Sequence, residues 1–173
     1  MSLFLPLCCQ AWAAEEGRSG RRPSPTAAFR EEHAALLEHV EHLRAVAAGL
    51  PTMGDAERTE ELKHILDFLR GTLIPHAEAE ERVLYPAVAE LLGDPRSTAT
   101  MISDHHAIVA RIEALAASAP DDVERLQELL YGLHALLIVH FHKEEDDYLP
   151  LLEARPAQEV AALFEEMGHG HEH

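Results

Sequence analysis

Two segments of the chain carry the same spaced pattern, a histidine followed four residues later by a glutamate and ten residues later by a proline. The first segment pairs His76 with Glu80, and the second pairs His140 with Glu144. On a helix, residues four apart lie on one face, with Cβ atoms about 5–6 Å apart. Each segment therefore offers an imidazole and a carboxylate in one direction, and two such helices facing each other could hold two metal ions.

Apolar residues recur at helical spacing around these segments and predict four amphipathic helices. They begin near Ser24-Pro25, Asp55, Asp94-Pro95 and Asp121, and end near Pro51, Gly93, Pro120 and Pro150. Pro75 lies inside the second helix, so we expect a kink just before His76. Four such helices with short loops pack most simply as an antiparallel up-down-up-down four-helix bundle, which makes the expected fold all-α. A short fifth helix is expected after Pro156.

Composition divides the chain into four parts. We interpret residues 1–28 as a disordered leader and linker, 29–153 as the helical domain, 154–167 as a short C-terminal helix and 168–173 as a flexible His-rich tail. The start of the chain is apolar but has no preceding Lys or Arg. A leader without function is therefore favoured over an export signal, and a cytoplasmic location is the default. No apolar run reaches the roughly 18 residues of a membrane span.

Charge and cysteine content exclude several kinds of partner and site. The chain has 14 Lys and Arg against 31 Asp and Glu, a net charge of −17, which repels phosphate backbones and argues against a nucleic-acid partner. The two cysteines, Cys8 and Cys9, are adjacent in the leader, so the helical domain has neither a disulfide framework nor a thiolate site. Any metal site must use imidazole and carboxylate ligands.

Each of the four predicted helices places one histidine on its apolar stripe, and these are His33, His76, His105 and His140. A single histidine on an apolar face is more often a hydrogen-bonded core residue than a ligand. Burying four of them with Glu80 and Glu144 costs several kcal/mol per charged group without compensation, and no Lys or Arg lies on the stripes. We therefore predict that these six residues bind metal, with a purely structural role for the histidines as the alternative.

Other acidic and histidine side chains lie off the stripes. We expect a surface or supporting position for His39, His42, His64, His106, His134 and His142. A one-residue error in helical phase would exchange His105 with His106, so both remain candidates for the third helix. Glu81 and Glu145 point about 100° away from the stripe and are expected to be solvated charges near helix ends.

Six imidazole and carboxylate ligands, two of which can bridge, favour a pair of first-row metals, with two iron ions preferred over zinc or manganese. Ferritin-like sites use two Glu-x-x-His motifs. Only Glu61 and His64 have that spacing here, and they lie on a polar face. A ferritin-like site is therefore excluded.

The combined pattern resembles the hemerythrin family, and more closely its bacterial HHE cation-binding branch. The resemblance covers about residues 29–153 and rests on Glu31-Glu32-His33, His76-x-x-x-Glu80, Asp104-His105, His140-x-x-x-Glu144, Leu84-Tyr-Pro86 and Tyr148-Leu-Pro150. It implies a four-helix bundle around a non-haem di-iron centre that binds O2 or related small ligands such as peroxide or NO.

Two positions depart from the oxygen-carrying members of that family. Met101 stands where they have a further histidine, and Glu144 stands in place of an aspartate one residue farther from the histidine. The resemblance then implies that one metal lacks an imidazole and has an open or water-filled position, which favours inner-sphere chemistry over simple carriage. Enzymatic activity is left open, and a metal- or oxygen-responsive sensor is the alternative function.

Overall fold

The computed structural model describes residues 24–168, which are helical and contain no strand. The predicted leader up to residue 23 and the predicted tail from residue 169 lie outside this range. The first helix is α1 (Ala27–Gly49), which a short 3₁₀ turn, η1 (Leu50–Thr52), follows. No helix within residues 24–168 is both long enough and apolar enough to cross a membrane.

Three further helical stretches complete the bundle, and a separate helix ends the described chain. The second stretch consists of α2 (Asp55–Phe68), η2 (Leu69–Leu73), α3 (Ile74–Ala79), η3 (Glu80–Leu84) and α4 (Tyr85–Leu92). The third is α5 (Ala99–Ala116), and the fourth consists of α6 (Val123–Lys143), η4 (Glu144–Tyr148) and α7 (Leu149–Leu152). The C-terminal helix expected after Pro156 is α8 (Ala157–Gly168).

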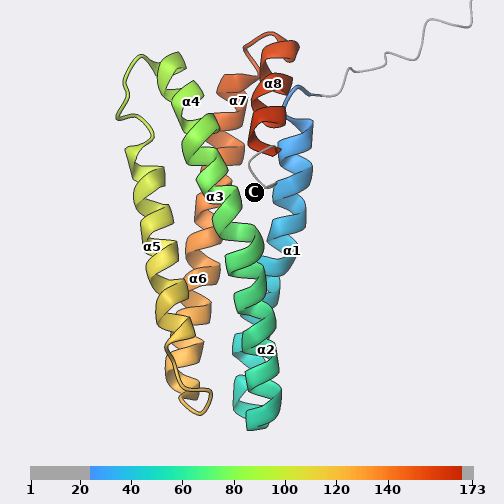
Figure 1. Cartoon of the computed structure of the whole chain (residues 1–173), viewed down its shortest axis with the longest axis vertical. Helices are drawn as coiled ribbons and strands as arrows, with labels where there is room; N and C mark the ends of the chain where they lie inside the picture. The colour runs from blue at the N-terminus through green and yellow to red at the C-terminus, as the bar shows by residue number, and fades with distance from the viewer. Residues whose placement is uncertain (1–23, 169–173) are drawn as a thin grey trace, which may run out of the picture.

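The four stretches lie side by side along the long axis of the molecule (Figure 1). The connection after α1 and the loop between α5 and α6 lie at one end, and the loop between α4 and α5 lies at the other. Helix α6 packs along both α1 and α5, and α8 packs on α3 and η3 next to the start of α1. The all-helical bundle expected from the sequence is therefore present.

Two apolar clusters fill the interior, one on each side of the buried histidines. On α1, for example, Phe29 belongs to one cluster and Leu36 to the other, with His33 between them. On α5 the same order is Met101, His105 and Ile108. The polar residues are thus enclosed between two hydrophobic layers.

Three π turns, η2, η3 and η4, each end two residues before a proline. Proline lacks a backbone N–H and its ring clashes with the carbonyl four residues earlier, so an α-helix cannot pass through it unchanged. The i→i+5 bonding of a π turn lets the helix continue. The π turn η2 lies where a kink is predicted before His76, and the fourth stretch ends at Leu152, two residues beyond Pro150.

Some helix starts also differ from those predicted. Asp122, rather than Asp121, caps α6 by accepting a hydrogen bond from the backbone N–H of Arg125 at 3.2 Å. Helix α1 begins at Ala27, within the segment predicted as leader. The hydroxyls of Ser24 and Thr26 donate to the Glu153 carboxylate at 2.6 and 2.7 Å, and tie the start of α1 to the end of the fourth stretch.

The core side of α6 should dominate the stability of the bundle. Leu133 is fully buried, whereas Tyr131, two residues away, is 42% exposed. We expect Leu133→Ala to lower the free energy of unfolding by about 2–5 kcal/mol, because it leaves a cavity in the larger apolar cluster. Tyr131→Ala should change it by less than about 0.5 kcal/mol. Denaturant titration measures both, and equal effects would contradict this account of the core.

Candidate metal centre

The six residues predicted to bind metal lie together in the middle of the bundle. They come from all four helical stretches, each is at most 4% exposed, and they are His33, His76, Glu80, His105, His140 and Glu144. On α5 it is His105 that faces the interior, while His106 is exposed.

The donor atoms form two groups that share Glu80, and Glu144 belongs to the second group. In the first group, His33 Nε2 and His76 Nε2 lie 3.5 and 3.0 Å from Glu80 Oε1. In the second group, His105 Nε2 lies 3.4 Å from Glu80 Oε2, and His140 Nε2 lies 3.4 Å from Glu144 Oε1. Within each group the donor atoms are close enough together to hold one metal ion.

Most of these donor atoms make no hydrogen bond within the protein. His33 Nε2, His76 Nε2, both oxygens of Glu80 and Glu144 Oε2 are buried and make no hydrogen bond. Leaving such atoms unsatisfied in an apolar interior is costly, and native proteins rarely do so. Imidazole nitrogen and carboxylate oxygen are the donors that first-row metals accept. The residues present therefore fit a pair of bound cations.

The outer nitrogen, Nδ1, of each of the four inward imidazoles is hydrogen-bonded to a carboxylate. The pairs are His33 Nδ1 with Glu145 at 2.7 Å, His76 Nδ1 with Glu32 at 3.0 Å, His105 Nδ1 with Glu81 at 2.8 Å and His140 Nδ1 with Asp104 at 3.5 Å. An ionised carboxylate only accepts, so each Nδ1 carries a proton, and the Nε2 of a neutral imidazole is then left with its lone pair free for a metal ion. Asp104 also receives a hydrogen bond from Lys143.

The sequence-based interpretation of Glu81 and Glu145 was therefore wrong. They are not solvated charges, because they orient His105 and His33 from neighbouring stretches. The sequence did contain a signal for this role, because both acids directly follow the inward glutamate of their repeat. Glu32 and Asp104 likewise stand immediately before an inward histidine.

Tyr85 is a further residue at the site that the sequence did not indicate. Its hydroxyl donates to Glu144 Oε1 at 2.6 Å and lies 3.2 and 3.5 Å from the Nε2 atoms of His105 and His140. On an ideal α-helix Tyr85 would lie about 140° around the axis from Glu80. The π turn η3 adds a residue to that turn and brings Tyr85 back toward the face of Glu80.

A family model of the hemerythrin HHE cation-binding domain matches residues 24–152, which is most of the chain. The chain belongs to this family. The resemblance seen in the sequence is thereby confirmed, and the match begins with the residues that tie α1 to the fourth stretch. Searches among curated proteins and among solved structures gave no match.

We call the six buried histidine and glutamate residues the HHE site, with one half around His33 and His76 and the other around His105 and His140. The two halves differ in charge when no metal is bound. Burial opposes protonation of His76, but the charge of Glu80 and the hydrogen bond to Glu32 outweigh it and raise the pKa of His76 to about 10. Burial, together with the charge of His105, lowers the pKa of His140 to about 4. The positive His76 holds the pKa of Glu80 well below its usual range despite burial, whereas burial and the charge of Glu80 raise that of Glu144.

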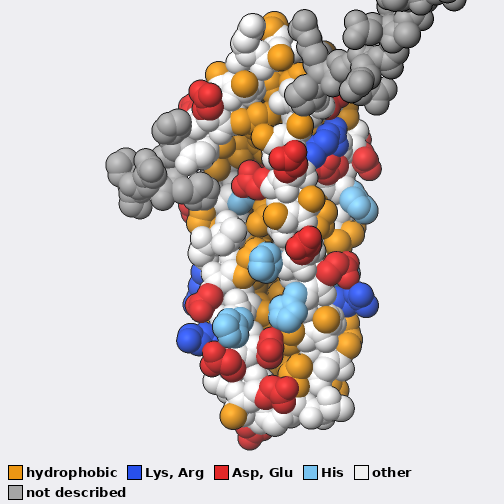
Figure 2. Space-filling model, turned by 90° about the vertical axis from the view of Figure 1, so that its right-hand side faces the viewer, with side chains coloured by type: hydrophobic (Ala, Val, Ile, Leu, Met, Phe, Trp, Pro, Cys, Tyr) orange, Lys and Arg blue, Asp and Glu red, His pale blue; other side chains and the backbone are white. Residues whose placement is uncertain are grey.

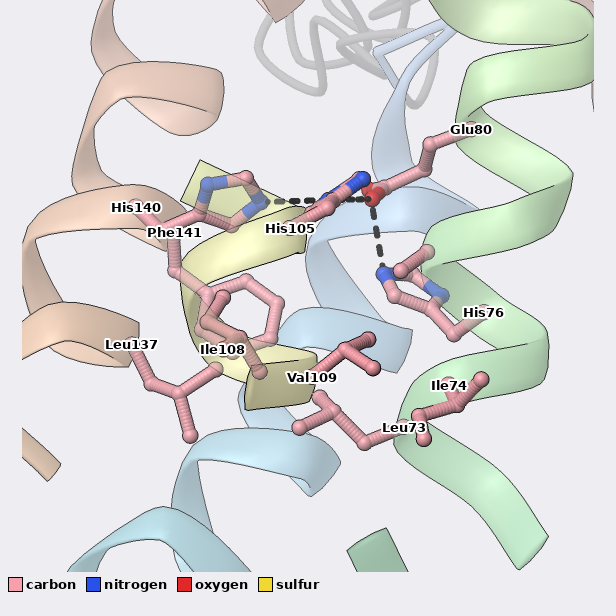
Figure 3. A pocket seen from close by; sticks show the side chains of 11 residues that line it. Leu73, Ile74, His76, Glu80, His105, Ile108, Val109, Leu137, His140 and Phe141 are labelled. Carbon is pink, nitrogen blue, oxygen red and sulfur yellow. Dashed lines mark hydrogen bonds and ion pairs between the residues drawn. The ribbon is translucent and has the colours of Figure 1, made fainter. Parts of the chain in front are cut away.

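A small cavity borders the HHE site on the side of α3, α5 and α6. It has a volume of about 20 Å³, room for one water-sized molecule. Apolar side chains form most of its wall, and His76, Glu80, His105 and His140 close its inner end (Figure 3). The donor atoms therefore border a small, mainly apolar space.

The histidines predicted to lie off the stripes are apart from the HHE site. Figure 2 shows histidine side chains lying among acidic ones on one long side of the molecule. His42 Nε2 lies 3.3 Å from Glu61 and His64 Nε2 lies 3.2 Å from Glu60, and both histidines are more than half exposed. These pairs are surface ion pairs of the kind that contribute little to stability.

The stability of the metal-free chain should fall as the pH rises above neutrality. Because the folded state raises the pKa of His76 from 6.5 to about 10, the resulting stabilisation is complete below about pH 6.5 and is lost as the pH approaches 10. The raised pKa of Glu144 acts in the same direction. We expect the melting temperature of the metal-free protein to drop between about pH 7 and pH 10.

The variant His76→Gln should flatten this profile, while the exposed control His64→Gln should keep it. A melting temperature of the wild-type chain that is constant over this range would contradict the charge assignment.

Proposed function

We propose that this chain is a non-haem di-iron protein that binds O2, peroxide or NO inside an antiparallel up-down-up-down bundle. The observation that carries the proposal is the pair of donor groups that share Glu80, in which five buried inner atoms make no hydrogen bond. Membership of a cation-binding family supports it independently.

The geometry supports a specific distribution of ligands. His33 and His76 would bind one ion, and His105 and His140 the other. The oxygens Oε1 and Oε2 of Glu80 face opposite groups, as do those of Glu144, whose Oε2 lies 3.8 Å from His33 Nε2. These positions support a bridging role for both carboxylates.

Iron is favoured over zinc or manganese by the chemistry of the proposed ligands and their surroundings. A pair of ferrous ions, when bound, would supply the two electrons that reduce O2 to the peroxide level, whereas peroxide itself would bind without electron transfer. Mixed imidazole and carboxylate ligands suit iron, and the apolar layers on both sides exclude water. The cavity beside the site has room for one small molecule.

The protein's own part is to hold the ligands in place and to limit access. The four outer carboxylates fix the orientation of the imidazoles and increase their basicity. The wall of Leu73, Ile108, Leu137 and Phe141 keeps the approach apolar. No general acid or base outside the donor set lines the cavity, which favours ligand binding over a proton-transfer reaction.

The first test is the metal content of the full chain. Protein reconstituted with ferrous iron should hold close to two ions per chain, and His76→Ala or His140→Ala should lower that content, because each removes a ligand of one ion. The exposed His64→Ala serves as the matched control and should retain both ions. Two tightly bound ions in both ligand variants would contradict the proposed site.

The second test concerns the outer carboxylates. Replacing Glu145 by Gln should weaken metal binding by about 10–100-fold, because His33 loses the charged acceptor that orients it. The adjacent and exposed Asp146→Asn changes the same charge without touching the site. Competition with a chelator measures both affinities, and equal affinities for the two variants would show that Glu145 has no such role.

A further inference from the structure

The two halves of the site offer different numbers of donor atoms. Around His33 and His76 only Glu80 and Glu144 complete the set. Around His105 and His140 there is a fifth atom, the phenol oxygen of Tyr85. The His105–His140 half, in which Met101 takes the place of a further histidine, thus has an additional oxygen donor.

We propose that Tyr85 supplies its phenol oxygen as a ligand to the metal in the His105–His140 half. The inference rests on the proposed function, since it requires that this half binds metal. It replaces the open position implied by Met101 with one filled by the protein itself.

The distances between the donor atoms support this role. Atoms that share one ion at about 2.0–2.2 Å lie roughly 3 Å from one another. The Tyr85 oxygen lies 2.6, 3.2 and 3.5 Å from the inner atoms of Glu144, His105 and His140, and the two imidazole Nε2 atoms lie 2.9 Å apart. The four atoms therefore already converge as the ligands of one ion would.

The surroundings of Tyr85 direct its hydroxyl toward the donor atoms of the site. The side chain is 1% exposed and belongs to the apolar cluster that also contains Met101. Its ring stacks on that of His105 at 5.4 Å, which fixes its direction. The hydroxyl contacts are all to donors of the site.

The second repeat lacks an equivalent donor, which makes the assignment specific to one half. Tyr85 is the fifth residue after Glu80, and the fifth residue after Glu144 is Leu149. Leu149 is fully buried and has no atom that could bind metal. Binding of the phenol breaks its O–H bond, forms the oxygen–metal bond and releases one proton to solvent, with no change in oxidation state.

The test is the visible spectrum of the full chain loaded with ferric iron. A phenolate bound to ferric iron gives a charge-transfer band in the visible range, and excitation in that band should enhance tyrosinate ring vibrations in the resonance Raman spectrum. Tyr85→Phe should lose the band. Tyr148→Phe is the matched control, because Tyr148 lies 6.0 Å from Tyr85 ring to ring and donates instead to the Ser97 carbonyl.

Three results would overturn the assignment. Wild-type protein with two ferric ions and no such band would show that Tyr85 only donates a hydrogen bond to Glu144. Retention of the band in Tyr85→Phe, or its loss in Tyr148→Phe, would place the phenolate elsewhere. The absence of tyrosinate vibrations from the wild-type Raman spectrum would overturn the assignment even where a variant fails to fold. Wild-type protein that binds no metal would instead overturn the proposed function, and this inference with it.

Discussion

Four hydrogen bonds from imidazole Nδ1 atoms to carboxylates determine how the interior is arranged. Each bond joins two different helical stretches. The bond of His33 with Glu145 joins the first stretch to the fourth, and that of His76 with Glu32 joins the second to the first. The bond of His105 with Glu81 joins the third stretch to the second, and that of His140 with Asp104 joins the fourth to the third. Together they form a closed ring around the bundle. The same bonds that aim the Nε2 atoms inward therefore also fix the stretches relative to one another.

The balance of charge inside this ring explains why the two halves differ. Apolar layers on both sides keep water out, so charges must be matched locally. Without metal, Glu80 is matched by a protonated His76, and Glu144 is matched by the Tyr85 hydroxyl. His140 has the weakest support, since Asp104 lies 3.5 Å away and also binds Lys143.

The repeat and the apolar stripes were sufficient to predict the bundle and to bring the six inward residues together, because both follow from helical periodicity alone. Tyr85 escaped prediction because the π turn η3 changes that periodicity directly after the inward glutamate. Glu81 and Glu145 do point away from the inward face, and they were misjudged because the histidines that they contact lie on other stretches. Which acid orients which histidine could not be read from one helix either, since every such pair spans two stretches. Within a single helix, the sign of that arrangement is the acid directly before the histidine in Glu32-His33 and Asp104-His105.

The π turns also determine where the chain tolerates a change in its own length. Each of η3 and η4 contains one residue more than an α-helical turn would need, and the proline that follows holds the turn in place. Deleting a single residue from Arg82 to Leu84 would restore ordinary α-helical bonding and leave the side chains of α4 close to their present faces. The same deletion within α5, which contains no π turn, would rotate everything beyond it by about a quarter turn and set its side chains against the wrong neighbours.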